Sequence, residues 1–220
     1  MEIIAAIWGF LTLLGGYFLY GYITYEARKE QGIKHFFRMV VHKKALIYTS
    51  IIVILALAAS VYGRFRNEYS VVQSYINLIM FYWLAALAWV DYREKIIPNQ
   101  LILVGLIMWV LEVVVEVLIL HTDIISVLLF SALGSVWGGL LIVIALVVKT
   151  ALGMGDAKMF LVIGLIYGLN NTYSILLMSV LIMATVSIIL LLMKKVTRKT
   201  AVPMAPFVLF GFTLCIFLGM

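Results

Sequence analysis

The sequence predicts an all-α, polytopic integral membrane protein, and two observations support this fold class. Of the 220 residues, 65% are hydrophobic and only 12% are charged, which is more apolar surface than one soluble core of this size can bury. Apolar runs of about 20 residues, the helix length that crosses ~30 Å of hydrocarbon, recur along the whole chain. Because backbone polar groups must be paired inside lipid, we expect these runs to be helices.

The short polar breaks between the apolar runs predict a bundle of about eight transmembrane helices in a single membrane domain, residues 1–220. The predicted spans are 3–23, 45–63, 71–90, 100–120, 126–148, 150–169, 172–193 and 203–220. Gly134 and Gly138 form a small-xxx-small pattern that indicates close helix packing in the fifth span. Trp83 and Trp89 are interpreted as anchors at the membrane–water interface.

The distribution of basic residues predicts that the N terminus lies outside the cytoplasm. This orientation places segments 24–44, 91–99, 149–158 and 194–200 in the cytoplasm, and together they carry 14 of the 16 Lys and Arg residues. Loops on the cytoplasmic side of membrane proteins are enriched in these residues. The bias therefore supports both the orientation and the number of spans.

Segment 24–44 combines apolar residues at helical one-face spacing with six Lys or Arg residues. Such a helix lies along a membrane surface with anionic headgroups. The segment is interpreted either as an anchoring connector or as a surface on which a substrate docks. In a membrane protein the net charge of +6 reports orientation, so we expect no nucleic-acid partner.

Two of the three aspartates, Asp91 and Asp156, fall at the cytoplasmic ends of predicted spans. Pro98 breaks the chain soon after Asp91. With a sixth helix starting near Thr150, Asp156 would lie about 9 Å along it. Two carboxylates within hydrogen-bond range cannot both ionise easily, so they share a proton, and one acts as general base on water while the other acts as general acid.

Other catalytic groups are scarce in this chain. Cys215 is its one cysteine, no histidine pair has ligand spacing, and no serine lies in a nucleophile motif. We therefore expect no metal and no cofactor. The structural alternative is that Asp91 and Asp156 are helix caps or ion partners of the nearby basic residues Arg93, Lys95 and Lys158.

The sequence resembles the type IV prepilin and preflagellin peptidases, membrane aspartic peptidases of the Gly-x-Gly-Asp class. The first similar motif starts at Asp91, continues through Arg93 and ends in Ile97-Pro98-Asn99. The second is Gly153-Met154-Gly155-Asp156-Ala157-Lys158, and a weaker one, Val202 to Phe207, contains Pro203 and Pro206. The resemblance covers residues 71–220, which would form the peptidase core.

The resemblance implies that Asp91 and Asp156 are catalytic, and the remaining motif residues would support them, with Pro203 and Pro206 on the substrate path. The activity it implies is removal of a short basic leader from pilin-like precursors at the cytoplasmic face of a prokaryotic cell membrane. Many relatives also methylate the new N terminus and carry a cysteine-bearing loop after the first span. Here segment 24–44 occupies that place without cysteine, so we predict cleavage without methylation.

Two other functions remain open from the residues alone. Glu112 and Glu116 lie on one face of the fourth span and would repel each other if both were charged. They indicate a water-filled outer cleft, a protonated pair or a subunit contact. With the two aspartates they could instead line the proton or cation path of a small carrier or channel. The other hypothesis is that the chain is a noncatalytic assembly protein that kept the fold.

Overall fold

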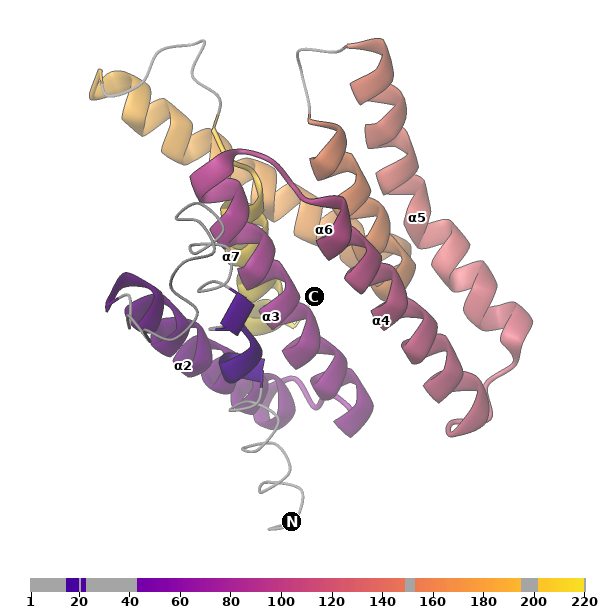
Figure 1. The fold of residues 1–220 in the computed structure, drawn as a ribbon. Coiled ribbons are helices and arrows are strands. Elements are labelled where there is room, and N and C mark those ends of the chain that lie inside the picture. The colour runs from indigo at the N-terminus through magenta and orange to yellow at the C-terminus, as the bar shows by residue number, and fades with distance from the viewer. Residues whose placement is uncertain (1–14, 20, 23–42, 149–152, 195–201, 220) are drawn as a thin grey trace, which may run out of the picture.

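The computed structural model describes residues 15–19, 21–22, 43–148, 153–194 and 202–219, and the regular structure of these residues is helical (Figure 1). Its labelled helices are α2 (Lys43–Arg66), α3 (Val71–Glu94), α4 (Asn99–Leu118), α5 (Ile124–Val147), α6 (Met154–Leu192) and α7 (Ala205–Leu218). Most of the predicted span 3–23 and of the basic segment 24–44 lies outside the described residues.

Among the residues that the structure describes, five helices, α2 to α6, are long and apolar enough to cross a membrane. The predicted spans 45–63, 71–90, 100–120 and 126–148 coincide with α2 to α5 within a few residues. The predicted last span, 203–220, becomes the 14-residue helix α7. At 1.5 Å per residue α7 is about 21 Å long, so it is shorter than the hydrocarbon core of a bilayer.

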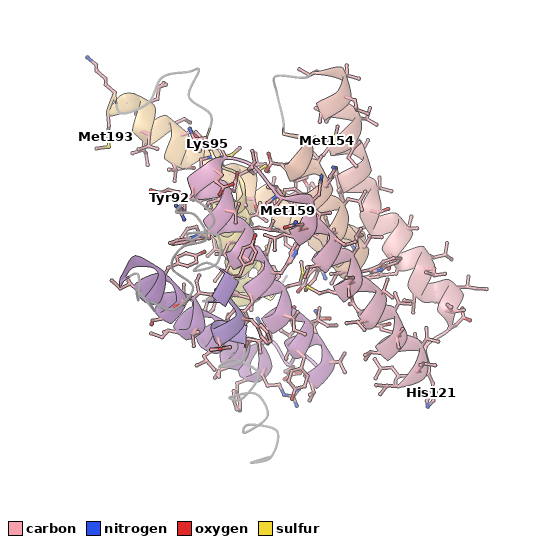
Figure 2. All side chains as sticks on the ribbon, in the orientation of Figure 1. Tyr92, Lys95, His121, Met154, Met159 and Met193 are labelled. Carbon is pink, nitrogen blue, oxygen red and sulfur yellow. The ribbon has the colours of Figure 1, made fainter. Side chains whose placement is uncertain are left out.

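Helix α6 joins the sixth and seventh predicted spans into one element of 39 residues with a break at Gly168. Gly168 has φ 70° and ψ −173°, a conformation open to glycine but costly for residues with a Cβ atom. The break divides α6 into two arms, residues 154–167 and 169–192. The second arm turns back, so that Met154 and Met193 lie toward the same end of the molecule (Figures 1 and 2).

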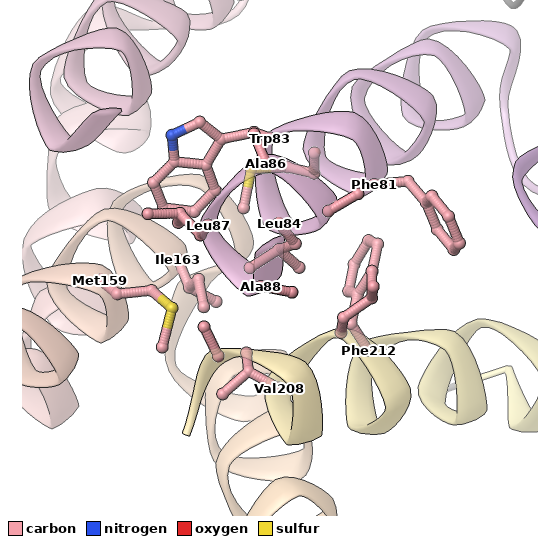
Figure 3. Packing of buried hydrophobic residues seen from close by; sticks show 14 of the residues in the cluster. Phe81, Trp83, Leu84, Ala86, Leu87, Ala88, Met159, Ile163, Val208 and Phe212 are labelled. Carbon is pink, nitrogen blue, oxygen red and sulfur yellow. The ribbon is translucent and has the colours of Figure 1, made fainter. Parts of the chain in front are cut away.

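Helix α3 forms the centre of the hydrophobic core. Figure 3 shows its buried residues, among them Phe81 and Leu84, facing Ile163 of α6 and both Val208 and Phe212 of α7. Because α3 is buried on most sides, its residues are fixed by packing against several helices rather than by lipid.

The interpretation of Trp83 as an interfacial anchor was wrong. Its side chain is 4% exposed, and its indole N–H donates a 2.7 Å hydrogen bond to the carbonyl of Leu101 on α4. Trp89 is half-buried and packs against Tyr48 of α2, with ring centroids 4.9 Å apart. Buried tryptophans need a partner for the N–H group, and Trp83 finds it across the α3–α4 interface.

Helices α4 and α5 lie at the periphery and expose many large apolar side chains. More than half of the side-chain surface is exposed at Leu103, Ile107 and Leu111 of α4 and at Leu129 and Leu133 of α5. In water such a surface would drive aggregation, whereas in a bilayer it faces lipid tails. These two helices therefore form a lipid-facing side of the protein.

The predicted close packing of the fifth span is confirmed at Gly134 and Gly138. A Cβ atom added to Gly134 would lie 2.0 Å from the carbonyl oxygen of Gly164, and one added to Gly138 would lie 2.2 Å from the Cα atom of Leu161. Backbones approach this closely only where side chains are absent. The first arm of α6 is therefore packed directly on the backbone of α5.

Candidate active site

Asp91 lies in the last turn of α3, and the end of this helix is fixed locally. Lys95 adopts the left-handed conformation (φ 55°, ψ 33°), and its N–H donates a 2.9 Å hydrogen bond to the carbonyl of Asp91. This is a common way for a helix to end, although glycine is the usual residue. Pro98 is then the N-cap of α4, as expected from the predicted chain break.

The carboxylate of Asp91 is buried, with 4% of the residue exposed, and bonds to a distant part of the chain. Its Oδ2 atom accepts a 2.8 Å hydrogen bond from the backbone N–H of Ala205, the first residue of α7. The N–H of Met204 donates to the same carboxylate. The segment flanked by Pro203 and Pro206 therefore holds Asp91 in addition to any role on the substrate path.

Asp156 lies in the first turn of α6 rather than 9 Å along a helix. The expected start near Thr150 was wrong, because Gly153 is extended (φ −71°, ψ 134°) and caps a helix that begins at Met154. The Asp156 carboxylate turns back and accepts a hydrogen bond from the N–H of Gly153. An acidic side chain at this position satisfies a backbone donor that the helix leaves free.

The segment that joins α3 to the first residue of α4 contacts the start of α6 through two motif residues on each side. A Cβ atom added to Gly155 would lie 2.8 Å from the Cβ atom of Ile97, so only glycine allows this approach. The Nζ atom of Lys158 donates a 2.9 Å hydrogen bond to Oδ1 of Asn99. These contacts bring the two aspartates within electrostatic range of each other.

Arg93 lies on the exposed side of the same helix end. Its guanidinium carbon is 5.9 Å from the centroid of the Trp89 ring, a distance typical of a cation–π contact. Arg93 therefore anchors the end of α3 against its neighbouring turn.

Chemically, the site offers two carboxylates at a boundary between apolar core and polar loops. In the described part of the chain, no group of three or more His, Cys, Asp or Glu residues is arranged to hold a metal ion. The arrangement suits chemistry in which carboxylates move protons to and from water. The three sequence motifs therefore lie together in one candidate site, which is formed by the ends of α3, α4, α6 and α7.

A model of the type IV leader peptidase family matches residues 78–188, which include both Asp91 and Asp156. The chain belongs to the type IV leader peptidase family. The resemblance to this family seen in the two aspartate motifs is thereby confirmed, and the family is one of membrane peptidases. Neither the curated proteins nor the solved structures give a match.

The backbone donors of Met204 and Ala205 are the part of this family member's site that sequence reasoning missed. The spacing of Pro203 and Pro206 indicates a helix start, because proline is favoured in the first turn. Nothing in the sequence indicates which carboxylate that helix start meets. The contact joins residues 114 positions apart, so only the folded chain reveals it.

Glu112 and Glu116 line a separate cavity of about 260 Å³ together with Gln73, Tyr167 and Asn171. Neither Asp91 nor Asp156 lines it. Oε2 of Glu112 is buried and has no hydrogen-bond partner among the described residues. The cavity agrees with the expected cleft. The protonated pair and the subunit contact stay predictions.

Proposed function

We propose that this leader peptidase family member is an aspartic endopeptidase that removes the short basic leader from pilin-like precursors. The observation that carries the proposal is the convergence of three motif segments: Asp91 bonds to Ala205, Gly155 packs on Ile97, and Lys158 bonds to Asn99. Contacts among segments so distant in sequence are what an assembled active site requires.

In this mechanism Asp91 and Asp156 flank the scissile peptide bond and share one proton. One carboxylate takes a proton from water, and the resulting hydroxide attacks the carbonyl carbon. The other carboxylic acid donates its proton to the carbonyl oxygen. Collapse of the tetrahedral intermediate then breaks the C–N bond, with a proton passing to the leaving amine.

The proposed setting is the cytoplasmic face of a prokaryotic cell membrane, with eight spans and the N terminus outside. Lys95, Met154 and Met193 lie toward one end of the molecule and His121 toward the other (Figure 2). The end of α3, which carries segment 91–99, and the two ends of α6, which flank the basic segments 149–158 and 194–200, lie toward the first end. Cytoplasmic loops are enriched in basic residues. The leader and segment 24–44 would both meet anionic headgroups there.

The test is cleavage of a co-expressed precursor that carries a short basic leader and an apolar helix. Asp91→Asn and Asp156→Asn keep side-chain size but remove the acid, and each is expected to abolish cleavage. Asp123→Asn is the matched control, because Asp123 caps α5 at the other end of the protein and asparagine caps helices equally well. Membrane insertion is checked for all three.

Persistent cleavage in either Asp91→Asn or Asp156→Asn would overturn the proposal and return the carrier or channel reading to consideration. Mass spectrometry of the cleaved product tests the proposed lack of methylation. A methyl group added to the new N terminus by this protein alone would contradict that part of the proposal.

A further inference from the structure

The two aspartates of the proposed site are held by different numbers of backbone donors from different origins. Asp91 accepts hydrogen bonds from Met204 and Ala205, which come from another helix. Asp156 accepts one from Gly153, which belongs to its own helix cap. The asymmetry matters because the chemistry gives the two carboxylates opposite roles.

The start of α7 has few free backbone N–H donors, and these donors face the carboxylate of Asp91. Pro206, the second residue of α7, has no N–H. The N–H groups of Phe207 and Val208 both donate to the carbonyl of Met204 inside the helix. The N–H groups of Met204 and Ala205 are therefore the donors of this first turn that reach the carboxylate.

A carboxylate is stabilised at a helix N-terminus because free N–H groups and the helix dipole both favour negative charge. Burial alone would disfavour the ionised form, and charge-assisted hydrogen bonds are what offset this cost. Asp91 has 4% of its surface exposed and two such donors. These donors therefore stabilise a buried carboxylate at Asp91.

We propose that the Met204–Ala205 backbone is a positioning element that keeps Asp91 ionised, so that Asp91 is the general base and Asp156 carries the shared proton. This inference rests on the proposed function. In the resting site, Asp91 is a carboxylate and Asp156 a carboxylic acid. The proposal thereby assigns each aspartate one role in every turnover.

The proton balance follows from this assignment. Asp91 takes a proton from water as the new C–O bond forms, and Asp156 gives its proton to the carbonyl oxygen. Asp91 then passes its proton to the amide nitrogen as the C–N bond breaks, and the intermediate's hydroxyl returns a proton to Asp156. One peptide and one water become one acid and one amine, and the site regains its starting state.

The decisive experiment replaces the Ala205 amide by an ester, with lactic acid in place of alanine, in the full chain translated into lipid nanodiscs. This change removes the N–H donor and keeps the side chain. The control is the corresponding ester at Val208, whose N–H donates to the carbonyl of Met204, the N-cap of α7. Both proteins are assayed for precursor cleavage as a function of pH, with thermal unfolding as the folding check.

We expect the Ala205 ester to lower kcat by about tenfold or more, as loss of a hydrogen bond to a charged group does. In this variant the acidic limb of the pH profile of kcat should move to higher pH, because Asp91 ionises less easily with fewer hydrogen-bond donors. The Val208 ester should leave the limb in place. An unchanged limb, or a shift to lower pH, in the Ala205 ester would overturn the proposal.

A second pair of variants applies if the ester protein does not fold. Ala205→Pro also removes the N–H, at the first helical position where proline is tolerated, whereas Ala205→Gly keeps it. A shift of the acidic limb of kcat to higher pH in Ala205→Pro but not in Ala205→Gly supports the inference. Equal pH profiles in the two variants overturn it. Loss of cleavage in Asp91→Asn and Asp156→Asn would still uphold the proposed function in that case.

Discussion

The two halves of the candidate site are built in different ways. Asp91 belongs to a block in which α3 and α7 interlock large side chains, with Phe81 and Phe212 ring centroids 6.5 Å apart (Figure 3). Asp156 belongs to an arm of α6 that lies on α5 through glycines, where Gly134 meets Gly164 backbone to backbone.

This difference shows how each aspartate is kept in place. The Asp91 carboxylate is held by donors on a second helix, so its position is set by tertiary structure. The Asp156 carboxylate bonds to its own helix cap, so its position is set by where the arm lies. The position of the arm in turn depends on its packing against α5 and on the contacts made by Gly155 and Lys158.

The largest effect is expected where the arm meets α5. Gly134→Ala places a Cβ atom 2.0 Å from the Gly164 carbonyl oxygen, so the arm must move. We expect the free energy of unfolding to fall by about 3 kcal/mol, at the upper end of overpacking effects, and precursor cleavage to fall with it. Thermal unfolding in detergent and a cleavage assay measure the two.

Gly139→Ala is the matched control, because a Cβ atom there meets nothing within 4 Å. It should be neutral or stabilise the helix by about 0.5–1 kcal/mol. Equal effects of the two substitutions would mean that the glycine contact does not position the arm.

An intermediate effect is expected when each carboxylate is removed. Asp91→Ala leaves the N–H groups of Met204 and Ala205 buried without an acceptor, which costs about 1–3 kcal/mol of unfolding free energy. Asp156→Ala loses one interaction at a helix start, which costs about 0.5–1 kcal/mol. Chemical denaturation of both variants in the same detergent gives the comparison.

Greater destabilisation by Asp156→Ala than by Asp91→Ala would reverse the comparison between the two halves. It would indicate that Asp156 has partners beyond its own helix cap. Both variants are expected to lack cleavage, so stability rather than activity separates them.

The smallest effect is expected for the hydrogen bond between Lys158 and Asn99, which lies near the surface. Lys158→Met and Asn99→Ala should each destabilise slightly, and a double-mutant cycle should give a coupling free energy of about 0.5 kcal/mol. Unfolding of the two single variants and the double variant measures it. Additive effects would show that the two side chains act independently.

Much of the fold was predictable because apolar runs and polar breaks mark helix ends. The limits of α2 to α5 follow from such breaks, and Pro98 marked the start of α4. The start of α6 did not follow, because Ala151 and Leu152 continue the apolar sequence upstream of Gly153, the residue that caps the helix. Hydropathy cannot detect a helix start that is set by backbone conformation alone.

The candidate site was predictable in its residues but only partly in its contacts. Motif spacing indicated Asp91 and Asp156 as the site residues. It did not predict the contact between Gly155 and Ile97. The role of Ala205 was hidden because its contribution is a backbone N–H, which every residue except proline possesses. The catalytic roles of the two aspartates stay predictions.

Two helices that reach the candidate site are short for a bilayer. The α6 arm of residues 154–167 and helix α7 each have 14 residues, so each extends about 21 Å against a hydrocarbon thickness of ~30 Å. Lipids adapt to short apolar helices by thinning locally. The membrane around Asp91 and Asp156 is therefore expected to be thin, which brings water closer to a peptide bond at the border of a substrate's apolar helix.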